Sequence, residues 1–463
     1  MPIPDASSYS HSLPHASLLN ANISRASLTP QRAKVALALL LFFAGAEFIV
    51  RGPVRLAERA GKYNDYTSSY VGAKAWMKGL NPYSNDVFWK LWAQSTNQPL
   101  HEEESIGSRT PYPWTCLMIL APFSLLGPRA ASIALGLIFS AMILAAIWLL
   151  SSLPDLSRDP WRRWLFVGLC LALSPIHSGL GQVNISMGAI ALVLLGFWAL
   201  EKNRPGLAGV LIAFSVALKP PIGAFFALFC LLKGQWRAVG FTVATGVALA
   251  LVAIGRLQLA GIPWLSAYLS NSKLVLTDPI NSITAANPKR FQMINLQVLW
   301  YSFTQSERSA NLLAIAVAGI LLAILAYLLV KNKGLALAPL EVGALAMVSL
   351  LPVYHRFYDA SLLVLPLLWL LSSSSEKMRP YRTLVLVLLL PFLFPGTSFL
   401  ENMQNAGRIP TSVSGSWWWN VFVLGHEIWA LLALALIIVA ATWRESHSRM
   451  TGVPGFAQNS TPA

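Results

Sequence analysis

The chain has 463 residues, of which 55% are hydrophobic and only 11% are charged, and its mean hydropathy is +0.57. Repeated apolar runs in such a composition indicate a polytopic helical membrane protein and exclude a soluble domain of this size. The formal net charge of +15 argues against nucleic-acid binding here, because much of the Lys and Arg lies in short loops between apolar runs.

Residues 1–30 are rich in Ser, Ala, Pro and His and lack the basic start, apolar middle and cleavage site of a signal peptide. We predict a disordered cytoplasmic tail there. Thirteen apolar candidates follow, at 34–50, 114–126, 131–150, 162–176, 183–200, 205–219, 222–233, 238–255, 310–330, 337–353, 360–374, 382–396 and 420–443. Several are shorter than the ~20 residues that a perpendicular helix needs, so we expect some to be tilted, broken by Pro or unable to cross.

Basic residues distinguish the two ends of the predicted spans in the second half of the chain. Eleven of them fall in five connections, 201–204, 233–237, 331–334, 375–382 and 444–449. Only three fall in the alternating connections, 177–182, 219–221, 354–359 and 397–416. The positive-inside rule predicts that the first set is cytoplasmic and that the second set faces outward with the long segment 256–309. This places four polar residues on one face: His177, Gln182, Lys219 and His355.

The first half of the chain gives a conflicting orientation. A cytoplasmic N-terminus places Asp65 outside, and three full crossings between 114 and 176 would then place 177–182 inside. We resolve the conflict by predicting that the short run 114–126 does not span separately. The result is a bundle of about twelve (11–13) transmembrane helices in a plasma (inner) membrane, with both termini cytoplasmic. The predicted transmembrane domain is 31–445, its outward segments are 51–113 and 256–309, and a disordered C-terminal tail is 446–463.

One acidic residue among aromatics, Asp65, follows the first apolar run closely and opens the stretch DYTSSY. A carboxylate near the membrane surface, in a polar segment that returns to the bilayer at the PYPW sequence of 111–114, suits the base of an enzyme that acts on lipid-linked substrates. Both long outward segments also mix Trp, Tyr and Phe with Lys, a pattern typical of short amphipathic helices in the interface. Such helices either hold a lipid headgroup near a catalytic residue or only seal the rim of the bundle.

Five short segments carry a family resemblance through their order and spacing: 65–83, PYP at 111–113, APFS at 121–124, GQVN at 181–184 and ALKPP at 217–221. Together, over about residues 34 to 445, they resemble glycosyltransferase family 87, the polyprenyl-phosphate-mannose-dependent mannosyltransferases among the C-type membrane glycosyltransferases. The resemblance implies a large helical bundle, an outward-facing active site, a lipid-phosphate sugar donor and a catalytic Asp in the first outward loop, which falls on Asp65. The chain departs from the family at Trp114, where many members have Pro, and loosely matches its late motif at 354–359.

Glycosyl transfer from a polyprenyl phosphate needs a base for the acceptor hydroxyl, cations for the leaving phosphate and an apolar groove for the prenyl chain. Asp65 can be the base, and a single carboxylate in that role suits an inverting displacement. Lys219, which stands before Pro220 where a helix must end, and Arg356 can stabilise the charge that develops on the phosphate. The predicted substrate-binding residues are Tyr66, Gln182, Asn184, Lys219, His355, Arg356, Tyr358 and Asp359.

Each assignment has a structural alternative. Asp65 is also compatible with a helix N-cap or an exposed loop acid, and Lys219 with a side chain that only snorkels to the interface. Gln182 and Asn184 either bind sugar hydroxyls or satisfy neighbouring helices. The cluster at 354–359 favours function, because His, Arg and Asp at the end of a span are costly unless they face a cavity.

Other polar residues point to no specific chemistry. Glu47 and Glu341 are lone acids near span ends, better suited to packing or hydrogen bonding than to catalysis. The run 102–104 of three Glu is either solvated or a weak divalent-cation candidate, the three cysteines have no disulfide or metal spacing, and no cofactor is specified.

The expected activity is therefore that of a glycosyltransferase for a hexose or a pentose, and the family resemblance implies mannose as the first candidate. Its expected partners are a polyprenyl-phosphate sugar, a glycolipid or glycan acceptor and membrane lipids, without nucleic acid. The competing class is a transporter or lipid-carrier flippase, which the lack of an internal repeat and the clustering of polar groups at one face disfavour. A catalytically silent scaffold would tolerate replacement of Asp65.

Overall fold

The computed structural model describes residues 30–96, 110–334, 338–394 and 396–451. Within these residues every named element is a helix, and an isolated antiparallel bridge joins Met293 to Arg356. The predicted all-α class is confirmed. The predicted N-terminal tail, up to residue 29, and the Glu run at 102–104 lie outside the described residues.

Six described helical segments are long and apolar enough to cross a membrane: Gln31–Arg59, Pro128–Ser151, Trp236–Leu259, Glu307–Lys331, Glu376–Asn405 and His426–His447. A seventh candidate is the pair Pro160–Ala172 and Ser174–Gly181, which is bent by 48°. Six shorter apolar helices accompany them, at Trp114–Leu125, Ile185–Glu201, Pro205–Leu218, Pro220–Leu232, Pro339–Ser349 and Phe357–Ser372. The membrane character is confirmed, whereas length and composition give six or seven spans and do not confirm the predicted count of about twelve.

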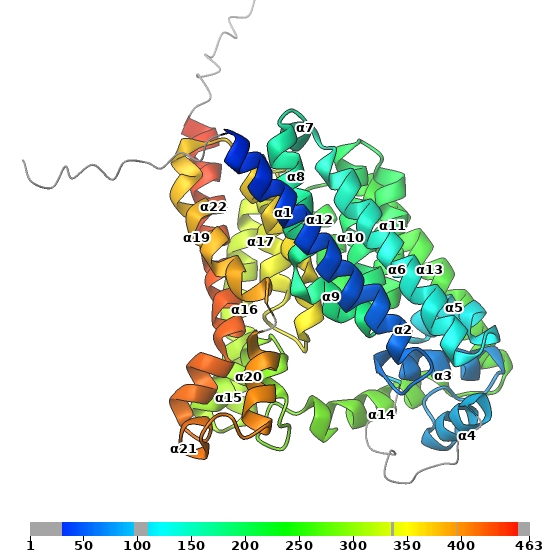
Figure 1. Ribbon diagram of the computed structural model, residues 1–463. Coiled ribbons are helices and arrows are strands. Elements are labelled where there is room, and N and C mark those ends of the chain that lie inside the picture. The colour runs from blue at the N-terminus through cyan, green and yellow to red at the C-terminus, as the bar shows by residue number, and fades with distance from the viewer. Residues whose placement is uncertain (1–29, 97–109, 335–337, 395, 452–463) are drawn as a thin grey trace, which may run out of the picture.

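One set of helices runs side by side as a bundle (Figure 1). They are α1 (Pro30–Ile49), α6 (Pro128–Ser151), α8 (Pro160–Ala172), α9 (Ser174–Gly181), α10 (Ile185–Glu201), α11 (Pro205–Leu218), α12 (Pro220–Leu232), α13 (Trp236–Leu259), α16 (Glu307–Lys331), α17 (Pro339–Ser349), α18 (Val364–Ser372), α19 (Arg379–Leu389) and α22 (His426–Thr451). Helices α10 and α17 are buried on nearly every side, as expected of helices that are apolar all round. They form the centre of the bundle, while α1 and α13 leave most of their apolar side chains exposed for lipid.

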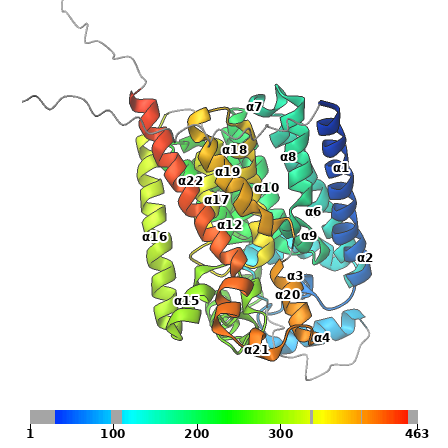
Figure 2. The same ribbon diagram turned by 60° about the vertical axis from the view of Figure 1, so that its left-hand side comes forward.

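A second set of helices gathers at one end of the bundle, which we call the site end (Figures 1 and 2). They are η1 (Val50–Val54), α2 (Arg55–Arg59), α3 (Asp65–Met77), α4 (Asn85–Thr96), α5 (Trp114–Leu120), η3 (Ala121–Leu125), α14 (Trp264–Leu276), α15 (Leu296–Thr304), α20 (Gly396–Asn405) and α21 (Thr411–Ser414). The remaining turns are α7 (Pro154–Ser157), η4 (Pro279–Asn281), η5 (Arg290–Gln292), η6 (Phe357–Leu363), η7 (Glu376–Met378), η8 (Leu390–Phe392) and η9 (Trp419–Leu424). Several site-end helices fall in the two predicted outward segments.

The opposite end, which carries α7 and the start of α1 and which we call the basic end, joins connections that the charge pattern groups as cytoplasmic (Figure 1). Lys233 Nζ donates to the Asn332 carbonyl at 2.9 Å, and Lys333 lies 5.3 Å from the centre of the Trp236 ring. Arg444 lies 5.8 Å from the ring of Tyr381, and the Ser446 hydroxyl donates to Asn332 Oδ1. Connections 233–237, 331–334, 375–382 and 444–449 therefore meet at one end.

Three predicted boundaries differ from the structure. The run 162–176 is broken at Leu173, because Pro175 cannot continue a helix but fits the first turn of a new one, α9. Helix α13 continues to Leu259, four residues beyond the predicted end at 255. Helix α22 continues to Thr451, past the predicted start of the C-terminal tail.

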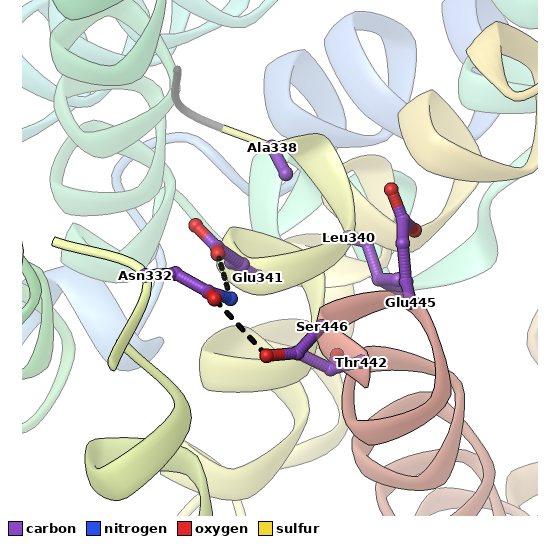
Figure 3. Close-up of a pocket in the computed structure, with 7 residues that line it drawn as sticks. All are labelled: Asn332, Ala338, Leu340, Glu341, Thr442, Glu445 and Ser446. Atoms are coloured by element: carbon purple, nitrogen blue, oxygen red, sulfur yellow. Dashed lines mark hydrogen bonds between the residues drawn. The ribbon is translucent and has the colours of Figure 1, made fainter. Parts of the chain in front are cut away.

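A buried ion pair ties four helices together at the basic end. Lys233 Nζ lies 2.9 Å from Glu341 Oε2, and both side chains are buried. Asn332 donates to Glu341 Oε1 at 3.1 Å and accepts from the Ser446 hydroxyl at 3.0 Å, beside a small cavity (Figure 3). Glu341 is thus hydrogen-bonded, as its lone position near a span end predicted, and the cluster links the ends of α12, α16, α17 and α22.

We expect Glu341→Gln to lower the free energy of unfolding by roughly 3 kcal/mol or more, because it leaves the Lys233 ammonium buried without its counter-charge. Thermal unfolding of the purified protein in one detergent measures the effect. The double variant Lys233→Met with Glu341→Leu removes both charges and should recover most of the loss. If the double variant were as unstable as Glu341→Gln, the unpaired Lys233 charge would not be the cause of the lost stability.

Candidate active site

Asp65 is the first residue of α3, and Asn64 caps the helix. The Asn64 side chain accepts from Tyr66 N at 3.0 Å, and Thr67 Oγ1 accepts from Asn64 N at 3.0 Å. The structure therefore rules out the N-cap alternative for Asp65, whose carboxylate is instead available for tertiary contacts. Its place in the first turn of the helix also stabilises its negative charge.

Two amides hold the half-buried Asp65 carboxylate. Asn184 Nδ2 donates to Asp65 Oδ2 at 2.9 Å. The Gln182 amide nitrogen, in the orientation that gives both polar atoms of the amide a partner, lies 3.3 Å from each carboxylate oxygen. These contacts join the first outward segment to the turn between α9 and α10, and so place 65 and 182 at the same end of the molecule. The orientation conflict disappears, and Trp114–Leu125 is among the helices too short to count as a span.

Lys219 lies between α11 and α12 in extended backbone, where Pro220 starts the next helix. Its ammonium donates to Asp359 Oδ1 at 2.7 Å and Oδ2 at 2.8 Å, and to Ser186 Oγ at 2.7 Å. Asp359 also accepts from His355 Nδ1 at 2.9 Å and from Arg356 N at 3.2 Å. Lys219 therefore does not simply snorkel to the interface: a buried carboxylate neutralises it.

Ser186 completes a hydrogen-bond relay from Asp65 to His355. Its hydroxyl accepts from Lys219 and donates to Asn184 Oδ1 at 2.7 Å, while Asn184 donates to Asp65. The relay therefore runs from Asp65 through Asn184, Ser186, Lys219 and Asp359 to His355. Ser186 was missed by the sequence analysis. The signal was its place two residues after Asn184, the cap of α10, because the backbone N–H at that position donates to the cap side chain and so holds the residue beside it.

Arg356 is the cation near Asp65 that has no carboxylate partner within ion-pair distance among the described residues. Its Nε donates to the Tyr354 hydroxyl, and Nη2 reaches the Ile280 carbonyl at 3.4 Å and Asn281 Oδ1 at 3.5 Å. Burial lowers the pKa of Arg356, but Tyr354, Tyr358 and Asp65 outweigh it and raise the pKa, so the guanidinium stays charged.

The second outward segment supports this cation. Met293 forms the isolated bridge with Arg356, and Ile294 N donates to the His355 carbonyl at 3.0 Å. These contacts fix the backbone of 355 and 356 against the turn that follows η5. The segment 256–309 therefore helps to build the site as well as to cover the bundle.

Three tyrosines surround the charged groups. Burial raises the pKa of the Tyr112 and Tyr354 phenols, and the nearby Asp65 carboxylate raises both further, so each phenol remains a hydrogen-bond donor at neutral pH. The ring of Tyr358 lies 5.5 Å from Lys219 Nζ, in a cation–π contact. Tyr358 is one of the substrate-binding residues predicted from the sequence, whereas Tyr112 and Tyr354 are not.

Two predicted residues lie apart from the relay. The Tyr66 ring is buried against Tyr70, with ring centres 5.7 Å apart, so it packs under α3. His177 is fully buried, with Nε2 2.6 Å from the Leu171 carbonyl and Nδ1 4.0 Å from Glu47, which pairs with Arg51. Within the described ranges, no group of three or more His, Cys, Asp or Glu side chains is placed to hold a metal ion.

The site thus combines a carboxylate fixed by two amides, an arginine without a counter-carboxylate, and phenol donors, all at the end of a membrane bundle. A search of curated proteins and a search of solved structures found no match to the chain. The model of glycosyltransferase family 87 matches residues 110–352, just over half of the 463 residues. Asp65 precedes the matched range, and 355–359 begin three residues after its end, while Gln182, Asn184 and Lys219 lie inside it. The chain therefore belongs to glycosyltransferase family 87 and is a membrane glycosyltransferase.

Proposed function

We propose that the protein transfers a sugar from a polyprenyl-phosphate donor to a lipid- or glycan-linked acceptor at the outer face of the plasma membrane. The observation that carries this proposal is the Asp65 carboxylate, held by Asn184 and Gln182 at the same end of the bundle as Arg356. The larger number of basic connections at the opposite end supports an outward-facing site. Family membership favours mannose as the sugar.

Asp65 serves as the general base. It accepts the proton of the acceptor hydroxyl as that oxygen forms its bond to the anomeric carbon of the sugar. The bond between the anomeric carbon and the donor phosphate oxygen breaks at the same time, and the phosphate leaves with the electron pair. One displacement of this kind inverts the anomeric configuration, and it needs no second carboxylate as nucleophile.

Arg356 stabilises the leaving phosphate in this mechanism. Negative charge grows on the phosphate oxygens in the transition state, so a nearby cation lowers the barrier more than it tightens ground-state binding. Lys219 is a weaker candidate than its position in the sequence suggests, because Asp359 already neutralises it. We assign Lys219, Asp359 and His355 to the support of the site, in which they hold Ser186 and the backbone of Arg356 in place.

Purified protein incubated with a panel of radiolabelled polyprenyl-phosphate sugars tests the proposal. We expect loss of label from the polyprenyl-phosphate mannose, and retention of label on donors whose sugar differs at C2. If the protein consumed only a pentose donor, the proposed transfer reaction would stand and the proposed sugar would be wrong. Retention of every donor in the presence of a membrane lipid and glycan extract would contradict the proposed function.

A further inference from the structure

Four cations form a basic patch at the site end: Arg55, Arg59, Lys62 and Arg129. Arg55 and Arg59 are four residues apart on α2, and Lys62 follows the turn at Gly61. Gly61 has φ +83°, and the position of a Cβ on it lies 3.2 Å from Arg129 Cβ, so the turn brings the start of α6 against the end of α2. Arg55, Lys62 and Arg129 are exposed, and Arg59 is half-buried.

This concentration of positive charge is unfavourable without an anion. Like charges four residues apart on a helix repel each other, as Arg55 and Arg59 do. Arg129 lies in the first turn of α6, where the helix dipole is already positive. Glu58 is the carboxylate within α2, whereas the nearby Arg51 is already paired with Glu47. The patch also lies at the end where the positive-inside rule disfavours Lys and Arg.

The surroundings of the patch suit a lipid. Val50 and Val54 on η1 and Leu125 and Leu126 before α6 are large apolar side chains that remain exposed. They lie just before α2 and just before α6, the two helices that carry Arg55, Arg59 and Arg129, so acyl or prenyl chains can cover them while a headgroup meets the cations. Clusters of Lys and Arg beside a membrane segment recognise anionic lipid headgroups in this way.

The patch is also next to the active site. Arg55 Cδ lies 3.3 Å from the position that a Cβ on Gly181 would take, so its side chain packs on the end of α9. The following residue is Gln182, whose amide faces Asp65. An anion on Arg55 would therefore be bound beside the turn that holds the carboxylate.

We propose that the basic patch binds the phosphate group of a membrane lipid. The phosphate belongs either to a polyprenyl monophosphate, the carrier released from the donor, or to an acidic phospholipid of the same leaflet. The two sources share one recognition chemistry, a phosphate anion with an apolar chain, and the experiment below separates them. The inference rests on the proposed function in taking the site end as the outer face and in naming the released carrier as one source of the phosphate.

Binding is measured with the full chain in phosphatidylcholine nanodiscs, with radiolabelled undecaprenyl monophosphate or phosphatidylglycerol as the probe. We expect Arg55→Gln with Arg59→Gln to weaken binding about 25-fold, from about fivefold for each cation. Arg129→Gln alone should weaken it about fivefold. The matched control is Arg158→Gln with Arg237→Gln, which removes the same charge from exposed residues at the basic end and should bind like the wild type.

Loss of undecaprenyl monophosphate binding alone would identify the patch as a carrier site, and equal loss of both lipids would identify a phospholipid site. Wild-type affinity for both lipids in the double and single variants would overturn the inference. Thermal unfolding of each variant checks that it is folded. Asp65→Asn should bind both lipids normally, because Asp65 is not part of the patch. Wild-type protein that binds lipid through the patch but consumes no donor would contradict the proposed function and leave the patch standing.

Discussion

Asp65→Asn is expected to slow sugar transfer by a factor of about 100 or more, with little change in donor binding. General-base catalysis typically contributes about 100-fold to 10,000-fold, and an amide cannot accept the proton of the acceptor hydroxyl. Asn keeps the size of the side chain and leaves α3 capped by Asn64, so the fold should persist. The measurement is the turnover number of the variant with the donor that the wild type consumes. Donor affinity is measured separately.

The matched control for this variant is Asp86→Asn. Asp86 is an exposed acid in the first turn of α4, in the same outward segment, so its replacement removes the same charge without touching the relay. It should leave turnover unchanged. Near-normal transfer by Asp65→Asn would make Asp65 structural and the mechanism wrong.

The membrane class of the protein and its candidate site residues could be predicted from the sequence, because both depend on local signals. Apolar runs predict membrane helices, and Pro220 predicts the break that places Lys219 between α11 and α12. Charge counts grouped the loops into two sets, and the contacts of Lys233, Lys333, Arg444 and Ser446 join four of the basic loops at one end. Asp65 followed from its place after the first apolar run, together with the family resemblance.

The partners of these residues were beyond the sequence, because they depend on packing between distant helices. Lys219 and Asp359 are 140 positions apart, and Asp65 and Asn184 are 119 apart, so no spacing rule links them. Tyr66 shows that a neighbour in the chain is not necessarily a neighbour of the carboxylate in space. It adjoins Asp65 in the chain, but its side chain leaves the helix in another direction and packs on Tyr70.

The pairing of Lys219 with Asp359 changes the roles that the sequence suggested for Lys219 and Arg356. Lys219 and Arg356 are both predicted from the sequence as candidates for the donor phosphate, with the functional role favoured for Arg356 and a snorkelling side chain left open for Lys219. The buried Asp359 carboxylate accepts from Lys219, His355 and the Arg356 backbone. It therefore neutralises the Lys219 ammonium inside the protein, and that charge is not free for a phosphate. Arg356 keeps hydrogen-bond capacity, because its side chain meets a phenol, a carbonyl and an amide.

Arg356→Ala is therefore expected to impair both donor binding and turnover, unlike Asp65→Asn. Loss of one preorganised donor to a developing oxyanion typically lowers turnover by about 100-fold to 1,000-fold, and loss of a phosphate cation also raises KM. Arg356→Lys should recover part of the binding but less of the turnover, because an ammonium cannot reproduce the forked contacts with Tyr354 and Asn281.

Steady-state kinetics with the donor at varied concentration separate the two effects. Arg408→Ala is the control, since Arg408 is an exposed cation after α20 at the same end of the molecule. It should leave KM and turnover unchanged. If Arg356→Ala raised KM without lowering turnover, Arg356 would bind the donor equally well in the ground state and in the transition state. Stabilisation of the leaving phosphate would then have to come from another group. Lys219 would be the first to test, with its ammonium released from Asp359.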